Sequence, residues 1–109
     1  MYTSNFSKKG NDVNAIAISI GIPNGFKGKR CLKLAPSWDM VNEYKKTGDK
    51  EAYIRKFNII LSKLNAREIY EELGDNAIML CYEKSGDFCH RRLVADWIRK
   101  ELGITVNEI

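Results

Sequence analysis

The most informative stretch of this sequence is Ala77-Ile78-Met79-Leu80-Cys81-Tyr82, a continuous apolar run. Such runs are typical of the central strands of parallel sheets, which are buried on both faces. A second run, Ala15-Ile16-Ala17-Ile18-Ser19-Ile20, is rich in β-branched residues and also predicts a strand. Weaker strand candidates lie at the chain ends, over Tyr2–Phe6 and Thr105–Ile109. We therefore expect a mostly parallel sheet of about four strands.

Helical sequence separates these strands. Ser37 is a predicted N-cap for a helix from Trp38 to about Lys46, and apolar residues at helical spacing predict a second helix that contains Tyr53 to Leu64. The other boundary signals are Asn65 with Glu68 in capping-box position, Gly74 after a third helix, and Gly103 after a last helix that contains Leu93 to Leu102. Strands that alternate with helices predict an α/β fold with helices on the faces of the sheet.

Length and composition limit the class of protein. A chain of 109 residues predicts a single domain over 1–109. No apolar run approaches the roughly 20 residues that a membrane span requires, and the N-terminus lacks the apolar segment of an export signal. Three cysteines, an odd number, argue against a disulfide framework. We expect a cytoplasmic protein with reduced cysteines and no membrane partner.

The positive charge is concentrated near the N-terminus. Residues 1–36 hold one acidic residue, Asp12, and the six basic residues Lys8, Lys9, Lys27, Lys29, Arg30 and Lys33. A basic region of this kind attracts anionic ligands, so a nucleotide or a nucleic acid is an expected partner. A solvated lysine-rich loop explains the same pattern.

The residues whose side chains can take part in catalysis or ligand binding are concentrated in the segment from Cys81 to Arg92. It joins the end of a predicted strand to the start of a predicted helix, which is where open α/β sheets bind ligands. With Asp87 or Ser85 as the N-cap, Cys89 and His90 fall in the first helical turn. The unpaired N–H groups of that turn favour an anion.

Six residues of this segment have candidate roles. Arg91, Cys81 and Asp87 are candidates for ligand binding, with Arg91 holding the anion. The helix N-terminus and the arginines favour a Cys89 thiolate, so that Cys89 is a candidate nucleophile. His90 and Glu83 are candidates for proton transfer.

Structural roles account for the same residues. His90 can be a packed imidazole that binds a backbone carbonyl, Glu83 can form a salt bridge with His90 or Arg91, and Cys81 and Cys89 can be small buried side chains. Zinc is not expected, because there is no CxxC pair and adjacent helical residues point about 100° apart. The sequence predicts no metal and no cofactor.

The sequence resembles the domain-of-unknown-function family 488, in its small bacterial and phage members. The quoted matches are Tyr2 to Phe6, Ala17 to Pro23, Leu34 to Pro36, Leu80 to Lys84, Gly86 to Arg91, and Leu93 to Trp97. The resemblance implies a small Rossmann-like fold and brings no reaction. It implies functional roles for Cys81, Glu83, Cys89, His90 and Arg91, and for Tyr2, Ser4 and Asn5 of the opening strand.

Three functions are compatible with these observations. The first is an enzyme that acts on a phosphate-bearing or nucleotide-like substrate at the Cys81–Arg92 segment. The second is a non-catalytic module that binds nucleic acid or a nucleotide through the basic residues, with stacking on Tyr2, Phe6, Phe26 and Trp38. The third is a structural or partner-binding protein in which the segment fixes a strand to a helix.

Overall fold

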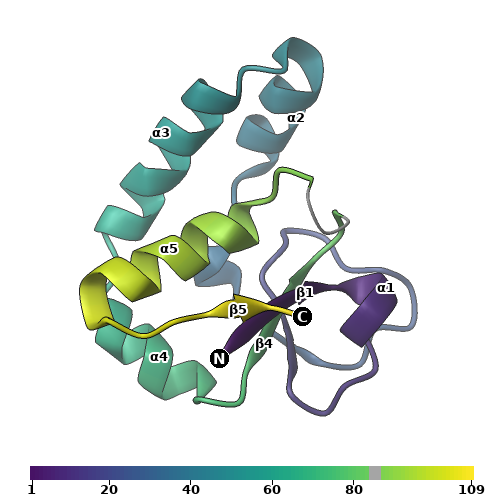
Figure 1. Ribbon diagram of the computed structural model, residues 1–109. Coiled ribbons are helices and arrows are strands. Elements are labelled where there is room, and N and C mark those ends of the chain that lie inside the picture. Colours follow the sequence, from purple (N-terminus) through teal and green to yellow (C-terminus); the bar gives the residue numbers. More distant parts are fainter. Residues whose placement is uncertain (84–86) are drawn as a thin grey trace.

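The computed structural model describes residues 1–83 and 87–109. In this part of the chain, five strands form one parallel sheet in the order β3-β2-β4-β1-β5 (Figure 1). The strands are Tyr2–Asn5 (β1), Ala15–Ala17 (β2), Lys29–Arg30 (β3), Ile78–Cys81 (β4) and Asn107–Glu108 (β5). The prediction of a small Rossmann-like α/β fold is confirmed, and the apolar run that begins at Ala77 supplies the central strand, β4.

The helices begin and end close to the predicted residues. They are Phe6–Lys9 (α1), Trp38–Thr47 (α2), Lys50–Ser62 (α3), Ala66–Leu73 (α4) and His90–Leu102 (α5), with a 3₁₀ helix, η1, at Leu32–Leu34. The side chains of Ser37 and Asn65 accept hydrogen bonds from first-turn N–H groups, as predicted. Gly103 ends α5 with a φ of 70°, in the left-handed region that favours glycine.

Helices cover both faces of the sheet unequally. Most of them, α2 to α5, lie on one side, and the short α1 lies on the other (Figure 1). Alternate residues of a strand point to opposite faces of the sheet. Ile16 and Met79 pack in the larger core with the long helices, whereas Ile78 and Leu80 pack with Phe6 on the other face. The larger core gives α5 a rigid support, which fixes the position of its first residues against the sheet.

Three short elements were not predicted, and one of them is the three-residue η1. The strand β3 has two residues, both exposed, and α1 is a single turn.

None of the helices in the described ranges is long and apolar enough to cross a membrane.

Candidate functional site

Three strands end together at one edge of the sheet. Asn5 of β1 is in register with Cys81 of β4, and Ala17 of β2 is in register with Leu80. The chain continues from this edge as Ile18-Ser19 after β2 and as Tyr82-Glu83 after β4. Ligands of open α/β folds bind at this carboxyl edge, and here it faces the start of α5.

Helix α5 begins later than the sequence predicts. Its N-cap is Cys89, with φ −150° and ψ 144°, and His90 is its first residue. The expectation of Asp87 as N-cap is therefore wrong, and the alternative, Ser85, lies outside the described residues. Because Cys89 is extended rather than helical, the argument that its side chain must diverge from that of His90 does not hold.

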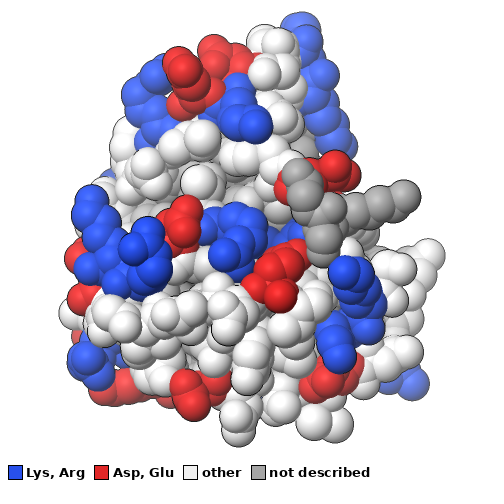
Figure 2. Space-filling model, in the orientation of Figure 1, with Lys and Arg blue, Asp and Glu red and all other residues white. Residues whose placement is uncertain are grey.

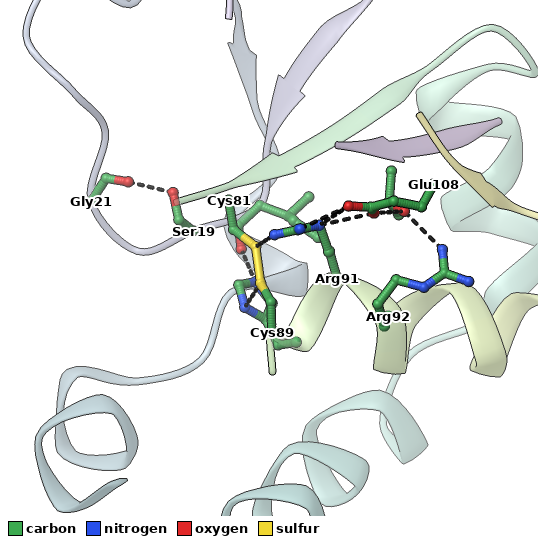
Figure 3. The surroundings of a disulfide bond; sticks show 10 residues. Ser19, Gly21, Cys81, Cys89, Arg91, Arg92 and Glu108 are labelled. Atoms are coloured by element: carbon green, nitrogen blue, oxygen red, sulfur yellow. Dashed lines mark hydrogen bonds and ion pairs between the residues drawn. A yellow bond between two sulfur atoms is a disulfide. The ribbon is translucent and has the colours of Figure 1, made fainter. Parts of the chain in front are cut away.

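Cys81 and Cys89 are joined as a disulfide in this structure (Figure 3). The bond links the last residue of β4 to the N-cap of α5, across eight positions of sequence. The expectation of reduced cysteines is thus not met for this pair. An odd number of cysteines still allows one disulfide, and here the fold brings the sulfur atoms of Cys81 and Cys89 together. Cys31 is a buried free thiol elsewhere, and burial raises its pKa.

The imidazole of His90 is buried and held in one orientation. Its Nε2 lies 2.6 Å from the carbonyl oxygen of Ile18, which can only accept, so Nε2 carries the proton. Burial lowers the pKa of His90 to about 4, and the neighbouring Arg91 acts in the same direction. The ring is therefore neutral at pH 7. Its unprotonated Nδ1 lies 3.7 Å from the Sγ of Cys89.

Arg91 is buried and is held by side chains of the protein. Its guanidinium donates to both carboxylate oxygens of Glu108, at 2.8 to 3.2 Å, and its Nη1 lies 3.0 Å from the Sγ of Cys81 (Figure 3). The partner is thus Glu108 of β5 rather than Glu83. Arg92 donates to the hydroxyl of Thr3, which in turn donates to Glu108.

Two candidate residues of the opening strand, Ser4 and Asn5, form their hydrogen bonds outside this cluster. Ser4 donates to the backbone carbonyl of Ile109, and the Asn5 side chain accepts from the N–H of Lys8 and caps α1. Tyr2 is 39% exposed. Ser4 and Asn5 therefore hold backbone segments in place.

A pocket of about 420 Å³ opens at the carboxyl edge, next to the disulfide. Cys81, Glu83 and His90 line it, together with Lys45 and Tyr53 from the helices above. A smaller pocket of about 170 Å³ is also lined by Glu83 and His90 and adds Cys89 and Phe88. The three candidate catalytic residues Glu83, Cys89 and His90 therefore do come together. Two larger hollows, of about 550 and 760 Å³, are lined by neither cysteine nor histidine.

Two exposed aromatic side chains form part of the pocket wall. Trp38 is 54% exposed and Tyr82 is 52% exposed, although both are large apolar residues. Both approach Gly21, where an added Cβ would lie 3.6 Å from the Trp38 ring and 3.9 Å from the Tyr82 hydroxyl. Tyr82 is held from behind by the Phe6 ring, at 5.0 Å between centroids. The pocket wall therefore presents two aromatic rings that remain open to solvent.

Several residues of the site carry no signal in the sequence. Lys45 and Tyr53 reach the pocket from α2 and α3, and Glu108 reaches Arg91 from the end of the chain. Such long-range partners cannot be read from spacing. The solvent exposure of Tyr82 could have been suspected, since it follows a buried strand directly.

Comparison with known proteins identifies the family of the chain. No curated protein and no solved structure matches the chain. The sequence profile of DUF488-N3a, described as the active DUF488-N3 subclade, matches residues 7–102. The match covers most of the 109 residues and includes the whole segment from Cys81 to Arg92. The chain therefore belongs to the DUF488 family, in its DUF488-N3a subclade.

Proposed function

We propose that the protein is an enzyme that acts on a nucleotide-like small molecule in the 420 Å³ pocket. One observation carries this proposal: the sulfur–imidazole cluster of Cys81, Cys89 and His90 borders the pocket that also presents Trp38 and Tyr82. Reactive groups, a concave site and an open aromatic surface therefore occur together. The description of the matching subclade as active also favours an enzyme over a binding module.

The aromatic wall supports a planar substrate. Trp38 and Tyr82 are each about half exposed, and a nucleobase can stack on such faces whatever its identity. Burying those rings against a base removes apolar area from water, so that the exposed aromatics become favourable contacts. This favours a substrate that carries a planar aromatic group.

The polar groups of the pocket support an attached phosphate. Lys45 lines both the large and the small pocket. The N-cap of α5, Cys89, makes no side-chain capping bond, so the positive end of the helix is not neutralised there by a side chain. Arg91, expected to hold the anion, is already paired with Glu108, and the proposal assigns that role to Lys45 and the helix end instead.

Binding of nucleic acid is less well supported. Phe6 and Phe26, two of the expected stacking residues, pack against each other at 5.2 Å between ring centroids. Lys33 pairs with Glu72, and Arg30 donates to a backbone carbonyl. On the face seen in Figure 2, basic and acidic side chains alternate and do not form one basic field.

The proposal is tested by incubating the reduced protein with mononucleotides, dinucleotides and nucleotide sugars, and by following each compound chromatographically. We expect turnover of at least one class by the wild type, loss of turnover in His90→Gln, and a higher KM in Trp38→Ala. Leu32→Ala is the matched control, because Leu32 is an exposed apolar residue that does not line the pocket. Equal behaviour of Trp38→Ala and Leu32→Ala, or no turnover of any class, would contradict the proposal.

A further inference from the structure

Three soft ligand atoms converge beside the pocket. The Sγ atoms of Cys81 and Cys89 and a ring nitrogen of His90 all lie within 4.8 Å of one another, and all three residues are buried. We propose that the reduced protein binds one Zn²⁺ ion through Cys81 Sγ, Cys89 Sγ and His90 Nδ1, with the fourth position open to the pocket. Three protein ligands of this kind and an open position are characteristic of catalytic zinc sites.

The spacing of the groups suits one ion. In a tetrahedral site with Zn–S near 2.3 Å and Zn–N near 2.0 to 2.1 Å, the ligating sulfur and nitrogen stand about 3.6 Å apart. His90 Nδ1 and Cys89 Sγ are 3.7 Å apart. The Cα atoms of Cys81 and Cys89 are 7.4 Å apart, beyond the roughly 4.4 to 6.8 Å of most disulfides. Two thiolates on one ion stand about 3.8 Å apart, so they allow such a separation.

The surroundings of these atoms resemble the outer shell of a metal site. A histidine ligand usually donates its other ring N–H to a carbonyl or a carboxylate, which fixes the ring. His90 does this, since its Nε2–H donates to Ile18 and leaves Nδ1 free to bind the ion. The guanidinium of Arg91 donates to Cys81 Sγ at 3.0 Å, a contact that supports a thiolate.

The charges of the proposed centre balance. Two thiolates neutralise one Zn²⁺ ion, and the buried Arg91 is neutralised by Glu108. The centre therefore introduces no net charge into the interior, which removes the main penalty for burying an ion in an apolar surrounding.

The disulfide and the metal exclude each other. A dithiol reductant supplies two electrons and two protons to the S–S bond and gives two thiols, while the reductant itself becomes a disulfide. Zn²⁺ then displaces those two protons and binds the thiolates. The oxidised protein is thus the metal-free form. In the zinc-bound form Cys89 is a ligand rather than a free nucleophile.

The inference deepens the proposed function and rests on it only for the use of the open position. Cys81 and His90 line the 420 Å³ pocket, so the open side of the ion would face a bound substrate. In that position the ion would bind water or a substrate oxygen and lower the pKa of the water. Metal binding itself requires no substrate.

The test uses the full chain, freed of metal with a chelator and kept reduced with a phosphine. Zn²⁺ is titrated in competition with a chromogenic chelator, and Co²⁺ is titrated while the thiolate charge-transfer and ligand-field bands are recorded. We expect one equivalent of either ion, a tetrahedral cobalt spectrum with thiolate bands, and no binding after oxidation of the protein. Cys89→Ser and His90→Gln should lose stoichiometric binding.

Cys31→Ser is the matched control, because Cys31 is buried but lies outside the cluster. It should bind Zn²⁺ as the wild type does. The cobalt spectrum of the wild type keeps the test decisive even if a variant fails to fold. The proposal is overturned if the reduced wild type binds no stoichiometric metal, or if Cys31→Ser loses binding and Cys89→Ser keeps it. Zinc binding without nucleotide turnover would refute the proposed function alone, and turnover by a protein that binds no metal would refute the zinc centre alone.

Discussion

Replacing Glu108 by glutamine should lower the free energy of unfolding by about 3 kcal/mol, because it leaves the Arg91 charge buried without a counterion. The Arg91 side chain is 1% exposed, and Glu108 binds it with both carboxylate oxygens. Breaking a buried pair costs about 3 to 5 kcal/mol. We take the lower limit, since the Glu108 side chain is 23% exposed and water partly screens the interaction.

The effect can be measured by thermal and urea unfolding. With an unfolding entropy of about 2.1 cal/mol/K per residue, 3 kcal/mol corresponds to a fall of about 13 °C in Tm for a chain of this length. Arg91→Met should be less damaging and should lower the free energy of unfolding by about 1 to 2 kcal/mol, because the Glu108 carboxylate that it leaves behind can be rehydrated. In the double variant, Glu108→Gln should add almost nothing to Arg91→Met, so that the coupling energy is about 3 kcal/mol.

Glu72→Gln is the control for the loss of an ion pair as such. Glu72 pairs with Lys33 at 3.2 Å, and both side chains are about half exposed. Exposed pairs contribute about 0 to 1 kcal/mol, so this variant should be nearly as stable as the wild type. The reasoning is refuted if Glu108→Gln is no more damaging than Glu72→Gln, or if the effects of Glu108→Gln and Arg91→Met simply add.

Three further predictions concern single residues. Because burial lowers the pKa of His90 to about 4 from 6.5, the unfolded chain binds more protons between these values. The stability of the reduced, metal-free protein should therefore be full above pH 6.5 and fall by about 3 kcal/mol as the pH drops to 4. Urea unfolding at several pH values checks this, and a His90→Gln protein with the same pH slope would contradict it. Asn65→Ala should cost about 1 kcal/mol in urea unfolding through loss of the α4 cap, and an unchanged midpoint would count against that cap. Gly103→Ala should lower Tm because residue 103 has a φ of 70°; an unchanged or higher Tm would disprove the strain.

Much of the fold was predictable because the decisive signals are local. The apolar run that begins at Ala77 becomes the central strand, and the caps at Ser37 and Asn65 start helices as predicted. The strand β3 was not predictable: Lys29 and Arg30 are both exposed, and pairing with β2 is what makes them a strand. No apolar alternation marks such an edge strand in the sequence.

The sequence was enough to predict which residues form the candidate site, but not how they are arranged. The sequence singled out Cys81, Cys89 and His90, and the structure brings them together. Their arrangement depends on the extended backbone of Cys89, which a pattern that assumes a helix there cannot show. The contact of His90 with Ile18 joins residues 72 positions apart, and so it depends on the strand order and on the packing of α5 against the sheet.

Nuclear magnetic resonance tests the location of the substrate site most directly. The chain has two tryptophans: Trp38 lines the pocket at the carboxyl edge, and Trp97 lines a hollow between α3 and α5. When a mononucleotide is titrated into the ¹⁵N-labelled, reduced protein, the Trp38 indole N–H and the amides of Ser19 to Gly21 should shift, while the Trp97 indole should not. Shifts confined to Lys8, Lys27 and their neighbours, or to Trp97, would contradict the account.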